Sequence, residues 1–148
     1  MKEQKKIVDD LIETLKDGQE GFKQAAEGVK DPQLKSVFNQ YSQQRSRFAA
    51  ELQSHAQDAG EAQTKASSSA AGALHRAWIN LKAAVTKGDD YAILAECERG
   101  EDSAVEEYKE AIENGLAAPV REIVSQQFAE IKRAHDHIRN LRDTTKKS

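Results

Sequence analysis

The sequence contains few of the residues that break or cross-link a chain. Two prolines and 8 glycines among 148 residues suit a single domain. The one cysteine, Cys97, excludes an intrachain disulfide and a zinc site built from several thiolates. No apolar run approaches the ~20 residues that cross a bilayer, so we expect no membrane partner. The beginning, MKEQKKIVDD, lacks the apolar core of a signal peptide, and we therefore expect a cytoplasmic protein.

Charge is abundant, but neither sign dominates. Lys and Arg number 22 and Asp and Glu number 25, which gives a net charge of −3. A chain without a basic excess cannot neutralise a run of phosphates, so we expect no nucleic-acid partner. Hydrophobic residues make up 38% of the chain and charged residues 32%, a balance that is typical of helices with one apolar face.

Apolar residues recur at steps of three and four, the period of an amphipathic helix, and no segment shows the alternation of a strand. Asp31-Pro32 indicates a helix start, because aspartate caps helices and proline is tolerated at their first position. Gly88 is expected to end a short helix in the left-handed conformation. The predicted helices cover residues 2–30, 31–60, 74–87, 89–114 and 119–142.

The connections between these helices predict the topology. Tight turns join the first two long helices and the last two, so each pair should form an antiparallel hairpin, and the matched lengths favour a bundle. The middle connection, about residues 60–88, begins with the small, polar stretch GEAQTKASSSAA, which we expect to be mobile. A long crossover of this kind is typical of ferritin-like bundles. The prediction is one all-α, ferritin-like domain over residues 1–148, with a frayed tail at about 143–148.

The short helix in the crossover carries Trp78 and Ile79. We expect it to cover the open side or end of the bundle, because a single tryptophan on an apolar stripe usually packs inside. Adjacent residues on a helix cannot both face one core, however. The alternative is therefore that Trp78 and Ile79 form a surface for a protein partner or a homodimer.

Polar residues that interrupt the apolar stripes are the candidates for a site. Arg45 interrupts the second helix and comes level with Glu101 or Asp102 if the second and third long helices are parallel, and we expect one inner layer that contains Arg45 with Glu101. Opposite charges near the middle of the bundle predict an ion pair, because an unpaired buried charge is strongly destabilising. The alternative is that Glu101 binds a metal with Arg45 behind it. Tyr41 and Gln127 complete the predicted polar core.

A second polar layer is expected about one turn away from this pair. It contains Glu98, His135 and Tyr41, together with Gln19 or Glu20 of the first helix. Oxygen and nitrogen ligands suit iron, manganese or zinc. The layer therefore predicts a single divalent ion held by Glu98, His135 and a carboxylate of the first helix.

A family resemblance is carried by LIETLKDGQEGFKQAAEGVKDPQLKSVF and by LHRAWINLKAAVTKGDDYAILAECERGEDSAVEEY. These stretches resemble the bacterial ferritin-like four-helix-bundle family catalogued as a domain of unknown function. ECERGED at 96–102 and LHRAW at 74–78 are the most specific elements, and the resemblance covers nearly the whole chain. It implies the fold strongly and an activity much less.

Active ferritin-like di-iron proteins use one Glu from each of two helices and a Glu-x-x-His pair from each of the other two. This sequence departs from that pattern. Its Glu and His residues are four apart on the second helix and five apart on the last, and the Glu of the first helix leans outward. The candidate metal ligands are Glu20, Glu51, His55, Glu98, Glu101 and His135.

Two functions remain open from the sequence. The incomplete di-iron pattern and the inserted Arg45 favour a non-catalytic, stress-associated or protein-interaction bundle with a buried polar core, and more weakly a homodimer. The alternative is a metal-binding ferritin-like protein, holding iron or manganese, with a redox or metal-handling role. The sequence favours the first, and on balance it does not predict an enzyme.

Overall fold

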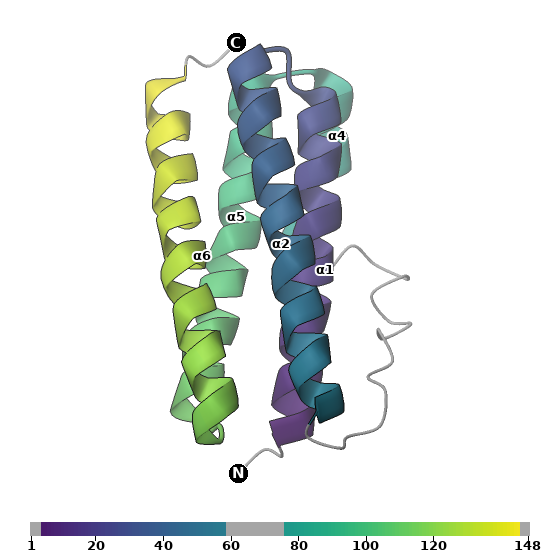
Figure 1. Cartoon of the computed structure of the whole chain (residues 1–148). Helices are drawn as coiled ribbons and strands as arrows, with labels where there is room; N and C mark the ends of the chain where they lie inside the picture. Colours follow the sequence, from purple (N-terminus) through teal and green to yellow (C-terminus); the bar gives the residue numbers. More distant parts are fainter. Residues whose placement is uncertain (1–3, 59–75, 146–148) are drawn as a thin grey trace.

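The computed structural model describes residues 4–58 and 76–145, and regular structure in these two ranges is entirely helical. The all-α bundle predicted from the sequence is confirmed (Figure 1). The elements are α1 (Gln4–Gly28), α2 (Pro32–Asp58), the 3-10 turn η1 (Arg76–Trp78), α4 (Leu81–Lys87), α5 (Asp90–Glu113) and α6 (Ala118–Thr144).

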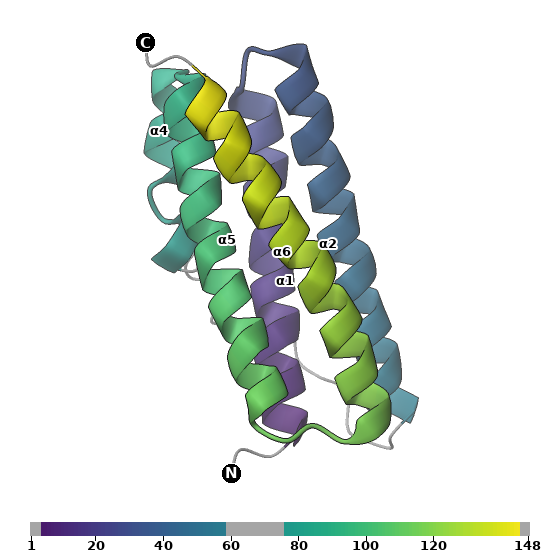
Figure 2. The ribbon, with the colours of Figure 1, turned by 90° about the vertical axis from the view of Figure 1, so that its left-hand side faces the viewer.

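Four long helices form the bundle. α1 and α2 are antiparallel neighbours, and so are α5 and α6, while α2 and α5 run in the same direction (Figures 1 and 2). α1 also packs against α5, and η1 and α4 lie against both of these helices. The start of α1 and the end of α6 lie at opposite ends of the bundle. The parallel arrangement of α2 and α5 sets their polar residues level with one another.

Aspartates fix the ends of the helices. Asp31 Oδ1 accepts a hydrogen bond from the backbone N–H of Gln33 at the start of α2. Asp89 caps α5, and Gly88 ends α4 with φ +69°. The carboxylate of Asp90 accepts the backbone N–H groups of residues 30 and 31, which ties the α1–α2 turn to the start of α5.

The structure differs from the predicted helices in two places. The helix expected over 74–87 is broken into η1 and α4 by a turn at Ile79 and Asn80, while residues 74–75 and the stretch expected to be mobile lie outside the described residues. α6 continues to Thr144, so residues 143–144 of the expected frayed tail are helical. The hydroxyl of Thr144 donates to the carbonyl of Asn140, which closes this last turn.

Because the helix is broken before α4, Trp78 lies at the α1–α5 interface. Its indole lies against Gly21 of α1 and Gly100 of α5, and a Cβ at either glycine would overlap the ring. Phe22 meets the indole edge-on at 5.3 Å between ring centroids. Ile79 remains at the surface with 62% exposure. η1 and α4 therefore cover the α1–α5 side, and Trp78 is a buried core residue rather than part of an exposed surface.

The apolar core is divided into two clusters along the bundle axis. One lies towards the start of α1 and includes Leu11 and Tyr108, and the other lies towards the α1–α2 turn and includes Phe22 and Phe38. Between the two clusters lies a buried polar layer. That layer is the first part of the candidate site.

Candidate functional site

The polar layer is an ion pair between α2 and α5. Arg45 Nη1 donates to Glu101 Oε2 at 2.6 Å, and Arg45 Nη2 donates to Oε1 at 2.5 Å. The two side chains are 1% and 0% exposed. The guanidinium carbon lies 5.3 Å from the ring centroid of Phe22, and Nε donates to Gln44. This is the ion-pair alternative weighed from the sequence, in a bidentate geometry.

The positive charge of Arg45 disfavours a metal ion at mid-bundle. Burial lowers the pKa of Arg45, but the adjacent Glu101 carboxylate raises it by more, so the guanidinium keeps its charge. Both oxygens of Glu101 are taken by Arg45. A permanent cation at this level would repel bound metal ions, so the residues present do not fit a dinuclear centre.

A hydrogen-bond network joins α5, α6 and α2 in the neighbouring layer. Tyr108 donates its hydroxyl hydrogen to Gln127 Oε1 at 2.6 Å. Gln127 Nε2 donates in turn to Glu51 Oε1 at 2.8 Å and to the carbonyl of Phe48 at 3.3 Å. Burial and nearby carboxylates raise the pKa of Tyr108 far above its usual value, so its hydroxyl stays protonated. Gln127 belongs to the polar core, and Glu51 serves as its partner.

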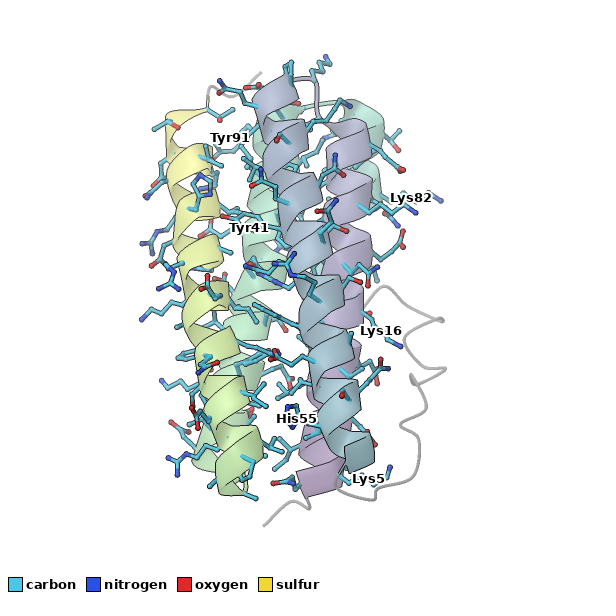
Figure 3. All side chains as sticks on the ribbon, in the orientation of Figure 1. Lys5, Lys16, Tyr41, His55, Lys82 and Tyr91 are labelled. Carbon is cyan, nitrogen blue, oxygen red and sulfur yellow. The ribbon has the colours of Figure 1, made fainter. Side chains whose placement is uncertain are left out.

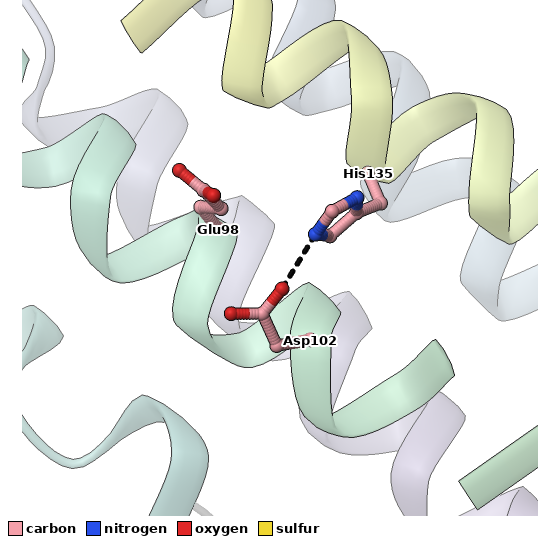
Figure 4. A group of neighbouring side chains, drawn as sticks. All are labelled: Glu98, Asp102 and His135. Atoms are coloured by element: carbon pink, nitrogen blue, oxygen red, sulfur yellow. Dashed lines mark hydrogen bonds and ion pairs between the residues drawn. The ribbon is translucent and has the colours of Figure 1, made fainter. Parts of the chain in front are cut away.

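A second group of side chains lies at the seam between α5 and α6. Glu98 and Asp102 are one helical turn apart on α5, and His135 faces them from α6 (Figure 4). One potential ligand atom from each lies within 4.8 Å of the other two. His135 Nε2 is 2.5 Å from Asp102 Oδ1. Glu98 and His135 are 13% and 15% exposed, whereas Asp102 is 60% exposed, so the group opens to solvent on one side.

The imidazole of His135 is held at both nitrogens. Its Nδ1 lies 3.0 Å from Asp136 Oδ1, on the side away from Asp102. Partial burial lowers the pKa of His135, but the hydrogen bonds to Asp136 and Asp102 raise it by more. The carboxylate of Asp136 also fixes the orientation of the ring. The position between Nε2 and Asp102 is therefore suited to a cation, either a proton or a metal ion.

Glu98 has a cationic neighbour of its own. Its Oε1 lies 2.6 Å from Arg142 Nη1 on α6. The contact does not meet the geometry of a hydrogen bond, so this buried oxygen is partnered by charge alone among the described residues. Arg142 also pairs with Asp143, at 2.9 Å from Nη2 to Oδ1. Glu98 is thus near both His135 and a competing positive charge.

Three predicted site residues do not join the seam group. Glu20 is exposed and accepts a hydrogen bond from Gln24 at 3.2 Å. His55 is half-buried towards the end of α2, well below Tyr41 in Figure 3. Tyr41 bonds to His137 Nδ1 at 2.6 Å and not to the predicted layer. The layer expected from the sequence, Gln19 or Glu20 with Tyr41, Glu98 and His135, is therefore not one group: Glu98 and His135 meet at the α5–α6 seam, whereas Glu20 and Tyr41 have other partners.

Sequence reasoning missed Asp102 as a candidate ligand. The third carboxylate was expected from the first helix, but the seam that holds Glu98 and His135 is formed by α5 and α6. A signal for it does exist in the sequence. Asp102 is four residues after Glu98, and residues at this spacing share one face of a helix.

Fold and site together define a bundle of four long helices with an arginine–glutamate pair in its core and a carboxylate–histidine group at one seam. The chain belongs to the family described as a domain of unknown function, DUF2383, whose model matches residues 5–114. The matched region includes the ion pair and Glu98 but ends before α6. No curated protein matches the chain. Among the helices of the described ranges, none has the length and apolar character needed to span a membrane.

Proposed function

We propose that this protein binds one divalent metal ion at the α5–α6 seam, with Glu98, Asp102 and His135 as ligands. The observation that carries the proposal is the approach of three ligand atoms to within 4.8 Å of one another. Ligands held tetrahedrally at about 2.1 Å from a zinc ion lie about 3.4 Å apart. The three atoms would have to move closer together to reach that separation.

The chemistry of the ligands supports a divalent ion. Two carboxylates offset its charge of +2, and a set of oxygen and nitrogen ligands suits iron, manganese or zinc. Asp136 on Nδ1 is the kind of outer partner that orients a ligating histidine. Three protein ligands leave coordination positions for water, which is consistent with a metal-handling or redox role.

Metal retention tests this proposal. The protein is incubated anaerobically with Fe(II), Mn(II) or Zn(II), loose ions are removed, and bound metal is measured by elemental analysis. We expect about one equivalent in the wild type and a large loss in His135→Ala and Asp102→Asn. His55→Ala is the matched control, because His55 lies outside the seam group and should leave retention unchanged. Retention that is absent in the wild type, or equal in His135→Ala, would refute the proposal.

The fold supports a ferritin-like bundle as part of the same proposal. Two antiparallel hairpins with α2 and α5 in parallel correspond to a bundle with one long crossover, and a single domain over residues 1–148 accommodates them. The metal site proposed here nevertheless lies at a seam and not between all four helices. The Arg45–Glu101 pair supports this displacement, because it fills the mid-bundle position.

A second candidate function is a non-catalytic, stress-associated bundle that acts through protein contacts, including a homodimer. Ile79 favours it, because it is a large hydrophobic side chain with 62% exposure. Ile79→Glu should then lower the molar mass measured by light scattering while the circular dichroism spectrum stays unchanged. A wild-type protein that is monomeric at all concentrations would contradict the homodimer.

A further inference from the structure

Arg142 forms an ion pair with one member of the seam group, Glu98. Its Nη1 lies 2.6 Å from Glu98 Oε1, and it comes from α6, two helical turns after His135. Glu98 is 13% exposed, so water does little to screen its charge. In this arrangement the guanidinium supplies the positive charge that a bound metal ion would otherwise supply to the same oxygen.

Arg142 is also able to release Glu98. Its side chain is 30% exposed, against 13% for Glu98. A second carboxylate, Asp143, already lies within reach of its Nη2 and Nε atoms, at 2.9 and 3.3 Å. Arg142 can therefore release Glu98 and keep a counter-ion, whereas Glu98 Oε1 accepts no hydrogen bond from the described residues.

We infer that Arg142 sets the affinity and the charge selectivity of the seam site, because it competes with the incoming metal ion for Glu98. This inference rests on the proposed metal-binding function. With Arg142 in place, the two ligand carboxylates and the guanidinium sum to a charge of −1, and without it they sum to −2. Repulsion between a nearby guanidinium and the metal grows in proportion to the charge of the metal ion. Arg142 therefore disfavours trivalent ions more than divalent ones.

Variants that remove or keep a single positive charge test the inference. Dissociation constants for Mn(II) and for Tb(III), as a trivalent probe, are measured by calorimetry in the wild type, Arg142→Gln, Arg142→Lys, Arg133→Gln and the ligand variant His135→Ala. Arg133 is the matched control, because it lies on the same helix and pairs with Glu130 outside the seam. We expect Arg142→Gln to bind Mn(II) about tenfold more tightly and Tb(III) more tightly still. Arg142→Lys, which keeps the charge, should stay close to the wild type.

The outcomes separate this inference from the function on which it rests. Equal Mn(II) affinities in the wild type and Arg142→Gln would overturn the competition by Arg142 and leave the metal site standing. An equal gain in affinity for Mn(II) and Tb(III) in Arg142→Gln would overturn the inferred charge selectivity. Failure of every variant to bind either ion more tightly than His135→Ala would overturn the metal site itself. Thermal unfolding of the metal-free variants shows that each one is folded before it is titrated.

Discussion

The buried Arg45–Glu101 pair makes a quantitative prediction about stability. Glu101→Leu removes the carboxylate that, among the described residues, pairs with the guanidinium, and it leaves a cation with 1% exposure without this partner. Breaking a buried pair in this way costs about 3–5 kcal/mol, against a total stability of about 5–15 kcal/mol for a domain. For a chain of this size the loss corresponds to a fall in melting temperature of roughly 6–20 °C.

The double variant Arg45→Met/Glu101→Leu removes both charges and fills the layer with apolar side chains. We expect its stability to lie within about 2 kcal/mol of the wild type, because an apolar replacement also avoids the desolvation of two ions. Urea unfolding followed by circular dichroism measures the free energies of unfolding of the wild type, the single variants Glu101→Leu and Arg45→Met, and the double variant. Glu130→Leu, at an exposed ion pair, should change stability by less than about 1 kcal/mol.

Two results would refute this reasoning. One is a loss below about 1 kcal/mol in Glu101→Leu, which would mean that the unpaired Arg45 reaches water. The other is a double variant as unstable as the sum of the two single variants. Additive losses would show that the two side chains contribute separately and that the observed pair has no coupling energy.

Two further predictions concern the packing of the crossover and the titration of the seam. Gly100→Ala pushes a methyl group into the ring of Trp78, so we expect a loss of about 1–3 kcal/mol and a red shift of tryptophan emission. Gly18→Ala, whose Cβ would make ordinary contacts, should gain up to about 1 kcal/mol, and equal effects of the two would contradict the close packing. Because folding raises the pKa of His135, its contribution to the stability of the metal-free protein is complete below the unfolded pKa of about 6.5 and is lost as pH rises through the folded pKa. Urea titrations over pH in a chelator should show this fall in the wild type and not in His135→Ala.

Most of the fold follows from local features of the sequence. The apolar stripes give the long helices, and Asp31-Pro32 marks a helix start that the structure confirms, because Asp31 caps α2. The break in the predicted helix at 74–87 is different, because it depends on where Trp78 inserts. The slot for its ring is formed by Gly21 and Gly100, which are distant in sequence, so no local pattern could show it.

The candidate site also has one part that the sequence predicts and one part that depends on how the helices pack. Arg45 could be set level with Glu101 or Asp102 once α2 and α5 were taken as parallel, because straight helices advance by a constant rise per residue. The partners of His135 depend instead on how α6 is rotated about its own axis against α5, and that rotation brings Asp102 to His135 and Arg142 to Glu98.

The Arg45–Glu101 pair and the seam group also differ in how easily a metal ion could reach them from solvent. A metal ion between all four helices would have to displace a bidentate guanidinium and open a core in which both partners are at most 1% exposed. An ion at the seam needs only the exposed carboxylate of Asp102 and the departure of Arg142 from Glu98. The ion pair at the centre of the bundle therefore favours the seam over the centre as the place of the proposed metal site. A metal bound there should exchange with chelators without unfolding of the protein, and exchange that requires unfolding would contradict the seam site.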